Sequence, residues 1–374
     1  METEKYYEIL IKKLDNAIQG LSKQGTKGNV SETWKEYLHV LVDPNDVKYL
    51  IELDVFPAVM SAKKFAKKIN KSIEEAEEIL DRLIKQDTVM IIGTRAKKYS
   101  IHMPFMMFDA PPLSYDKYPK EKAQKLAELS LKYLIEEEWY RNFEGSPQTP
   151  LTRIIPVQES VDVTKKILPY EDVINLIEEA EIISIQKCAC RTRYDFLGTR
   201  KCDHPLESCF GVDQGAKFFI ERGHAREISK DEAKEMLKEF NKMGLVHTTE
   251  NYQEGAHSLI CNCCACCCSL LGGITRWDNP RAVAASNFVA INADLENCAR
   301  CETCIENCNF KAIVMEDDGP VIDKKKCMGC GVCVVNCPQE IIELKREKRE
   351  IVYKNLLEMA AKILKETNRE LKGF

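Results

Sequence analysis

Cysteine is the residue type most able to do chemistry in this sequence of 374 residues, which contains 18 cysteines. Eight of them stand near the carboxyl end in two runs, each spaced C-x₂-C-x₂-C-x₃-C: Cys298, Cys301, Cys304 and Cys308, then Cys327, Cys330, Cys333 and Cys337. Thiolate is a soft ligand that iron–sulfur clusters select, and this tight spacing lets one loop supply three corners of a cluster. The two runs therefore predict two iron–sulfur clusters and a role in carrying electrons.

The stretch from Cys298 to Pro338 resembles a bacterial-type dicluster (2[4Fe–4S]) ferredoxin domain. In that family the fourth cysteine of each run binds the cluster of the other run. The resemblance therefore implies one [4Fe–4S] cluster on Cys298, Cys301, Cys304 and Cys337, and a second on Cys327, Cys330, Cys333 and Cys308. The sequence departs from the pattern at Asn309, where the family has proline, so we expect a looser exit turn with no ligand lost. A pair of zinc sites is the alternative for repeated C-x₂-C, but the interlocked runs favour iron–sulfur.

The other ten cysteines lie in the middle of the chain: Cys188, Cys190, Cys202 and Cys209, then Cys261, Cys263, Cys264, Cys266, Cys267 and Cys268. They cannot all serve one four-coordinate site, and Cys263 and Cys264 point to opposite faces of an extended chain. Either both groups bind clusters, the first having enough thiolates for a full [4Fe–4S] set, or one cluster uses some of them. A zinc ribbon on four of them is the alternative. Paired cysteines are similar to those of heterodisulfide-reductase-type domains, which carry noncubane clusters, although the spacing differs.

Three polar residues accompany the first of these groups. Arg191 and Arg193, next to candidate ligands, could raise the potential of a cluster, bind an anionic substrate, or be surface charges. His204 stands beside Pro205 in a polar loop, and we expect it to form hydrogen bonds rather than to bind a metal. His224, His247 and His257 have no ligand spacing.

Composition sets broad limits on the class of protein. Hydrophobic residues make up 44% of the chain and charged residues 30%, as in a soluble globular protein, and the length suggests two or three domains. The net charge of −5 does not indicate nucleic acid, and no apolar run is long enough to span a membrane. The opening METEKYYEIL lacks the features of a signal peptide. In a chain that is not secreted, cysteines more often bind metal than form disulfides. Because so many free thiols would oxidise easily, we expect the protein in a reducing, anaerobic cytoplasm.

The first third of the chain suggests a winged helix. Residues 1–30 open with an amphipathic helix, whose predicted apolar face is Tyr6, Ile9, Leu10, Leu14 and Ile18. Residues 31–115 should hold a basic helix at 62–70, a second helix opened by the capping box of Ser72 and Glu75, and a hairpin of strands 89–92 and 99–103. This order is similar to the winged-helix domain of bacterial transcription regulators.

The charge of the second helix argues against DNA binding. Residues 71–86 carry three basic and five acidic side chains, a net charge of −2, and phosphates repel an acidic helix. The acidic residues are Glu74, Glu75, Glu77, Glu78 and Asp81. Basic residues of the preceding helix and the wing, including Lys63, Lys64, Arg95 and Lys97, could hold a DNA backbone without reading bases. We therefore favour dimerisation or partner docking for this domain.

The remaining parts complete an α+β multidomain fold with a winged-helix-like amino-terminal domain, a cysteine-rich α/β middle domain, a ferredoxin-like domain and a carboxyl-terminal helix. A connecting helix at 118–143 and a GSPQTP linker fill residues 116–150. The cysteine-rich domain covers 151–290, with strands at 153–157 and 181–186 and helices at 170–180 and 229–243 among its elements. The ferredoxin domain covers 291–342. The tail, 343–374, is predicted to be a helix with Ile351, Leu356, Leu357, Met359, Ala360 and Leu364 on its packing face.

Taken whole, the sequence is similar to a family of anaerobe 4Fe-4S dicluster-domain proteins with these same parts. The leading hypothesis is an electron-transfer protein that relays electrons between a redox partner protein and the cysteine-rich domain. One alternative is an oxidoreductase that reduces a small molecule at an open or noncubane cluster. Another is a redox-sensing DNA-binding regulator. We find no flavin or nucleotide fingerprint, and a homodimer is compatible with the winged helix and the tail.

Overall fold

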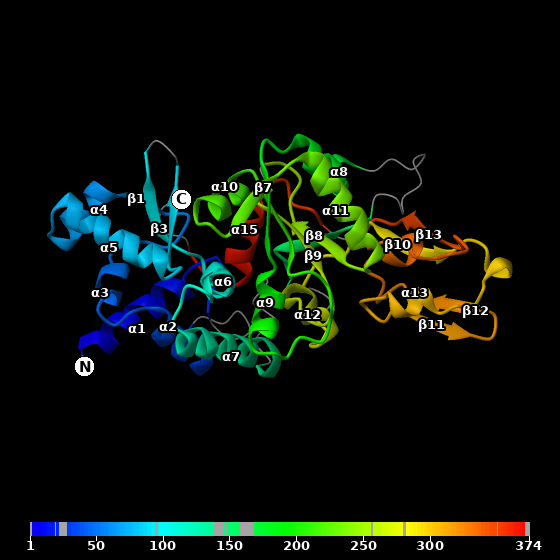
Figure 1. The fold of residues 1–374 in the computed structure, drawn as a ribbon, viewed down its shortest axis with the longest axis horizontal. Coiled ribbons are helices and arrows are strands. Elements are labelled where there is room, and N and C mark those ends of the chain that lie inside the picture. The colour runs from blue at the N-terminus through cyan, green and yellow to red at the C-terminus, as the bar shows by residue number, and fades with distance from the viewer. Residues whose placement is uncertain are drawn as a thin grey trace. The chain divides into compact units, whose positions relative to one another are not determined.

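The computed structural model describes residues 2–18, 20–21, 28–93, 96–137, 146, 148–157, 168–255, 257–279, 282–349 and 351–370. The chain divides into two compact units (Figure 1). The first unit is Met1–Thr149 with Thr192–Arg200 and Ala360–Phe374, and the second is Pro150–Arg191 with Lys201–Met359. Among the described helices, none is long and apolar enough to cross a membrane.

The first unit is mainly helical. Its helices are α1 (Glu2–Asp15), α2 (Glu32–Leu41), α3 (Val47–Leu50), α4 (Ala62–Ile69), α5 (Ile73–Lys85), α6 (Pro104–Asp109) and α7 (Lys120–Glu136). Strands β1 (Met60–Ser61), β2 (Val89–Ile92) and β3 (Lys98–Ile101) form an antiparallel sheet in the order β1-β3-β2. The helix, helix and hairpin order predicted for this region is present, while the winged-helix assignment itself stays a prediction.

The structure confirms the predicted capping box of the first unit and corrects part of its predicted apolar helix face. The capping box is present, because the Glu75 amide donates to the Ser72 hydroxyl at 3.1 Å and the Ser72 amide donates to the Glu75 carboxylate at 3.0 Å. The predicted apolar face of α1 was partly wrong: Ile9 is 41% exposed, while Tyr7, which was not assigned to that face, is buried. The five acidic side chains of α5 are exposed, so the negative charge of this helix lies at the surface. Helix α7 ends at Glu136; residues 138–145 and Arg95 of the wing lie outside the described part.

An aromatic core holds the first unit together and includes one of the two arginines. Trp34 packs against Tyr37, Phe108 and Tyr133, with ring centroids 5.3 to 5.7 Å apart. The Arg193 guanidinium lies 4.8 Å from the centroid of the Phe108 ring, donates to the Phe108 carbonyl at 2.6 Å, and pairs with Asp109. Arg193 is fully buried in this core, so its reading as a surface charge was wrong.

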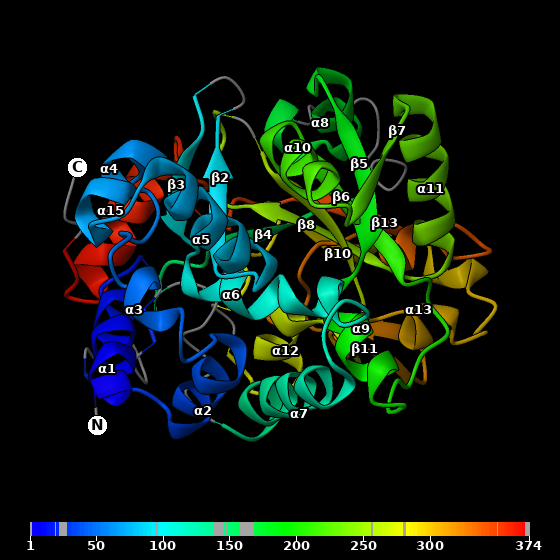
Figure 2. The ribbon, with the colours of Figure 1, turned by 60° about the vertical axis from the view of Figure 1, so that its left-hand side comes forward.

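The second unit is built on a six-stranded antiparallel sheet in the order β4-β8-β9-β6-β5-β7. The strands are β4 (Thr152–Ile155), β5 (Ile183–Lys187), β6 (Glu207–Val212), β7 (Ala225–Ile228), β8 (Val246–Glu250) and β9 (Leu259–Cys263). The helices are α8 (Val173–Glu179), α9 (Ala189–Phe196, which continues into the first unit), α10 (Gln214–Glu221), α11 (Lys230–Lys242) and α12 (Ser269–Thr275). Figure 2 shows α10 against β5 and β6.

The alternation of side chains along the strands gives the sheet two different faces. Phe210 and Ile260 are register partners, and the Phe210 ring lies 6.0 Å from that of Phe240 on α11. Cys209 and Cys261 are also register partners, and each lies next to Phe210 or Ile260 in the sequence. Neighbouring residues of a strand point to opposite faces, so the two cysteines point away from the face of Phe210 and Ile260. Cys263 shares that face because it lies two residues beyond Cys261. Helix α11 therefore covers one face, and the other face carries thiols.

The carboxyl-terminal part of the second unit adds two hairpin-like pairs. Strands β11 (Ile313–Glu316) and β12 (Gly319–Ile322) pair across a turn at Asp317 and Asp318. Helices α13 (Thr303–Glu306) and α14 (Val332–Val335) are short and lie within the cysteine runs. Strand β10 (Phe288–Asn292) pairs with β13 (Ile342–Arg346). The prediction of a helix from residue 343 was wrong. Ile342 and Leu344 are both buried and alternate with more exposed residues, which is the pattern of a strand, so β13 comes before the helix. Helix α15 begins only at Leu356 and ends at Glu366, and Ile351 is 70% exposed.

A buried histidine makes this sheet sensitive to acid. His247 is fully buried between Asn262, 2.6 Å from its Nδ1, and Asn241 of α11, 2.6 Å from its Nε2. Burial lowers the pKa of His247 from 6.5 to about 4, although the hydrogen bond with Asn262 acts in the opposite direction. The folded state thus keeps a neutral imidazole where the unfolded chain binds a proton, so stability is lost as the pH falls from about 6.5 toward 4.

We predict that lowering the pH from 7.5 to 5.5 costs the native protein roughly 1.3 kcal/mol through this histidine. In His247→Gln that part of the loss should vanish, since glutamine does not titrate. Anaerobic thermal unfolding of both proteins at the two pH values measures the difference. An equal loss in the two proteins would contradict the assignment.

Candidate metal centres

The eight carboxyl-terminal cysteines are arranged as two sets that cross between the runs. A small cavity is lined by Cys298, Cys301, Cys304 and Cys337, the set that the ferredoxin resemblance implies for one cluster. For the other set, burial raises the pKa of Cys330 to about 12, and the neighbouring Cys327 and Cys308 raise it further. These neighbours support the crossed assignment, which remains a proposal for the individual ligands.

Backbone amides point at several of these sulfur atoms. The Ala312 amide donates to Cys308 Sγ at 3.2 Å, and the Ala290 amide donates to Cys327 Sγ at 3.4 Å. The Arg300 amide donates to Cys298 Sγ at 3.4 Å. Hydrogen bonds of this kind stabilise thiolate over thiol, so the donor set fits a cluster bound by ionised cysteines.

Six cysteines of the middle region form a ring in which neighbouring thiols shift one another's pKa. We call them the six-thiol group: Cys188, Cys190, Cys209, Cys261, Cys263 and Cys268. Strand β6 supplies Cys209, and β9 supplies Cys261 and Cys263 from the thiol-bearing face of the sheet. Cys188 and Cys190 lie at the start of α9, and Cys268 is the N-cap of α12, where it accepts from the Leu271 amide at 3.4 Å.

The thiols of this ring compete for ionisation. The pKa of Cys209 is lowered because Cys188 and Cys261 donate hydrogen bonds to it. Contact with Cys190 and then with Cys209 raises the pKa of Cys188, and contact with Cys209 raises that of Cys261. One thiolate therefore opposes the ionisation of its neighbours, and a full set of thiolates requires cations among them.

The other four middle cysteines form a second, tighter cluster, which we call the four-thiol group. The Sγ atoms of Cys202, Cys264, Cys266 and Cys267 all lie within 4.8 Å of one another. Cys264 to Cys267 form a turn closed by the Cys268 amide, which donates to the Cys264 carbonyl at 3.0 Å. Arg276 supports the turn by donating to the Cys266 carbonyl at 2.7 Å.

This grouping differs from the order of cysteines along the chain. The set of Cys188, Cys190, Cys202 and Cys209 was one possibility for a cluster, and the structure places Cys202 with the turn of the four-thiol group. Cys263 and Cys264 do fall into different groups, as their opposite directions in an extended chain require. His204 belongs to neither group.

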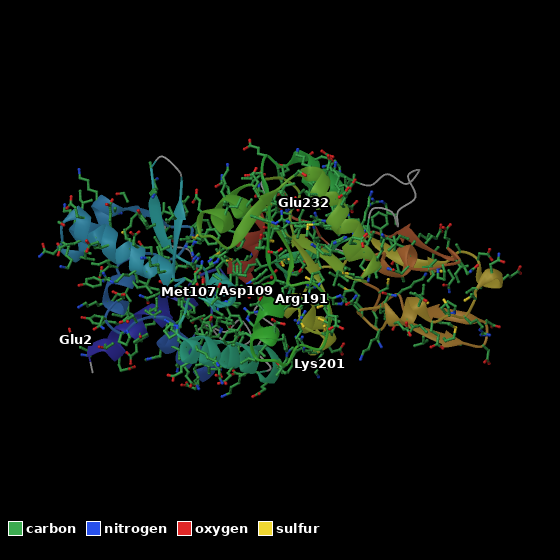
Figure 3. All side chains as sticks on the ribbon, viewed as in Figure 1. Glu2, Met107, Asp109, Arg191, Lys201 and Glu232 are labelled. Atoms are coloured by element: carbon green, nitrogen blue, oxygen red, sulfur yellow. The ribbon has the colours of Figure 1, made fainter. Side chains whose placement is uncertain are left out.

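Arg191 lies between the two groups as a buried cation. It is fully buried and donates to the Pro205 carbonyl at 3.0 Å, to the Asn262 carbonyl at 2.7 Å and to the Ser208 hydroxyl. Burial lowers the pKa of Arg191, but the neighbouring Cys188 and Cys264 outweigh it and raise the pKa above its usual value. Figure 3 labels Arg191 and shows sulfur atoms gathered beside α12. The reading of Arg191 as a surface charge was wrong, and its site is suited to offsetting thiolate charge.

Residues 297–342 match the family model of the 4Fe-4S dicluster domain. The match covers the two regular cysteine runs and indicates 4Fe-4S clusters in this part of the chain. Comparison with curated proteins gave no match, and comparison with solved structures gave none either. The cysteine-rich region therefore has to be understood from its own geometry.

The dicluster domain is fastened to the cysteine-rich region by Asn309, the residue that replaces the family's proline. Its amide Nδ2 donates to the Gly244 carbonyl at 2.8 Å, and its Oδ1 accepts from the Ala265 amide at 2.8 Å. Ala265 belongs to the turn of the four-thiol group. Proline could make neither bond, so the departure from the pattern, expected only to loosen a turn, adds a connection between the dicluster domain and the four-thiol group.

We predict that Asn309→Ala lowers the stability of the second unit by about 1–3 kcal/mol, because two partly buried backbone groups lose their partner. Asn297→Ala is the matched control, since Asn297 is exposed and its side chain bonds to exposed Asp294. Anaerobic thermal unfolding followed by loss of cluster absorbance measures both. Equal midpoints for the two variants would show that Asn309 is not a fastening residue.

Proposed function

We propose that this protein is an iron–sulfur electron-transfer protein in which the dicluster domain exchanges electrons with a redox partner and relays them to a further cluster on the six-thiol group. The 4Fe-4S clusters of such a domain, when bound, accept and donate single electrons. The observation that carries the proposal is a core shared by cysteines of the dicluster domain and of the six-thiol group.

In that core, cysteines of the two sets pack against the same apolar side chains. Buried Cys263 and Cys268 of the six-thiol group pack in one apolar cluster with Met328 and Val332, against which Cys308 and Cys330 are partly buried. The backbone fixes the contact, because the Val157 amide donates to the Cys330 carbonyl at 2.9 Å. The Ser286 amide also donates to the Met328 carbonyl, at 3.1 Å. The second ligand set of the dicluster domain therefore faces the interior of the cysteine-rich region.

The first ligand set lies at the surface, where a partner can reach it. Cys301 is exposed. Residues 294–318 carry seven acidic and two basic side chains, all exposed, so 2 − 7 gives a local charge of −5. Exposed apolar side chains accompany these charges at Val314 and Val321, which are register partners on β11 and β12. An apolar patch within an acidic surface suits a redox partner with a basic docking face.

The six-thiol group has the chemistry expected of an iron–sulfur ligand set. All of its donors are soft sulfur atoms, and the Ser269 amide donates to Cys190 Sγ at 3.3 Å. Thr248 places its hydroxyl 3.6 Å from Cys263 Sγ, and Arg191 supplies positive charge beside Cys188. These contacts can hold several ionised thiolates around a metal centre, and a set of six soft sulfur donors fits an iron–sulfur cluster.

Iron and acid-labile sulfide analysis of anaerobically purified protein tests the proposal. We expect clearly more than the roughly eight irons of two [4Fe–4S] clusters. The double variant Cys261→Ser/Cys263→Ser should fall to about eight irons while keeping the electron paramagnetic resonance of the reduced dicluster domain. The proposal fails if the native protein already contains only about eight irons and the variant contains the same number.

The acidic surface generates a second prediction. Electron transfer from the reduced protein to cytochrome c, a basic acceptor, should slow as ionic strength rises, because the attraction is screened. Glu302→Gln/Asp317→Asn should slow it at low salt by several-fold, and Glu121→Gln/Glu128→Gln on α7, outside the dicluster domain, should not. Stopped-flow absorbance gives the rates, and a rate independent of salt and of both double variants would exclude this docking face.

A further inference from the structure

We propose that the four-thiol group binds one zinc ion as a tetrahedral tetrathiolate site, separate from the iron–sulfur clusters. The inference concerns Cys202, Cys264, Cys266 and Cys267 alone. It is independent of the proposed electron-transfer function, because zinc has no redox chemistry and would contribute structure.

The spacing of the sulfur atoms is that of ligands around a single ion. A metal–sulfur bond of about 2.3 Å in a tetrahedron places the sulfur atoms about 3.8 Å apart. The Sγ atoms are 3.8 Å apart for Cys202 and Cys267, 3.7 Å for Cys266 and Cys267, and 3.5 Å for Cys264 and Cys266. All pairs in the group lie within 4.8 Å.

The dicluster domain provides an internal comparison. A four-iron cube binds each thiolate through a different iron, so its ligands lie further apart than ligands of one ion. Within the described residues, which include every cysteine, the four-thiol group is close enough to hold a single metal ion and no group of three dicluster cysteines is. The same structure therefore distinguishes the two spacings, and the four-thiol group has the single-ion spacing.

Zinc fits this donor set better than a single iron does. Four thiolates close the coordination sphere, as in structural zinc sites, and divalent zinc binds such ligands more tightly than ferrous iron. Four thiolates around a divalent ion leave a net charge of −2. Buried Arg191 contacts Cys264 and offsets part of this charge.

The ion would join two segments that are distant in the sequence. Cys202 belongs to the loop that precedes β6, and the other three ligands belong to the turn between β9 and α12. Cys263 and Cys268 of the six-thiol group flank this turn directly in the sequence. Fixing the turn therefore also fixes the positions of two thiols of the neighbouring group.

Metal analysis and X-ray absorption of the native protein test the inference. Protein produced with both iron and zinc in the medium and purified without oxygen should contain about one zinc per chain. Zinc-edge absorption should show four sulfur neighbours at about 2.3 Å and no nearby iron. A zinc content near zero, or a zinc shell of nitrogen and oxygen, would overturn the proposal.

Variants locate the ion on the chain. Cys266→Ser should lower the zinc content several-fold and leave the iron and sulfide content unchanged. Cys301→Ser, the matched control in the dicluster domain, should change the iron signal and leave zinc at about one per chain. Loss of iron and sulfide in Cys266→Ser, with zinc unaffected, would assign the group to a cluster instead. The absorption measurement on native protein stands even if Cys266→Ser does not fold.

Discussion

Ionised thiols packed against one another repel, and this constraint governs the second unit. All 18 cysteines belong to that unit, and ten of them form two groups in mutual contact. A buried thiolate is unfavourable unless hydrogen bonds or positive charge compensate it. Arg191 is one guanidinium beside two groups, and it cannot balance more than a fraction of their charge. In the proposed assignment metal ions provide the rest, and metal binding and folding of this region are then coupled.

The sheet organises this chemistry through its two faces. One face is covered by α11, through contacts such as that of Phe210 with Phe240, and the other presents Cys209, Cys261 and Cys263. The dicluster domain then docks through backbone bonds and through Asn309, which places its inner ligand set against the six-thiol group. A surface ligand set, an inner ligand set and the partly buried six-thiol group thus follow one another within a single compact unit.

What the sequence predicted well depends on local spacing. The runs that hold the dicluster ligands and the capping box at Ser72 are short-range patterns, and the family match and the hydrogen bonds support them. The position of Cys202 and the burial of Arg191 depend on which loops meet across the fold, and no periodicity encodes that. Strand β13 was not predicted, because its two buried residues, Ile342 and Leu344, stand among charged residues and give only a short alternating pattern. Asn309 could be noticed in the sequence, because it departs from the family pattern and such a departure indicates that the side chain has a partner of its own.

We infer that the middle cysteines bind two different metal centres next to the dicluster domain. Anomalous diffraction from crystals grown without oxygen, recorded on both sides of the iron and zinc edges, would locate both metals. We expect iron peaks at the dicluster domain and within the six-thiol group, and one zinc peak between Cys202 and the turn of Cys264 to Cys267. Iron confined to the dicluster domain, with no metal among the middle cysteines, would contradict it.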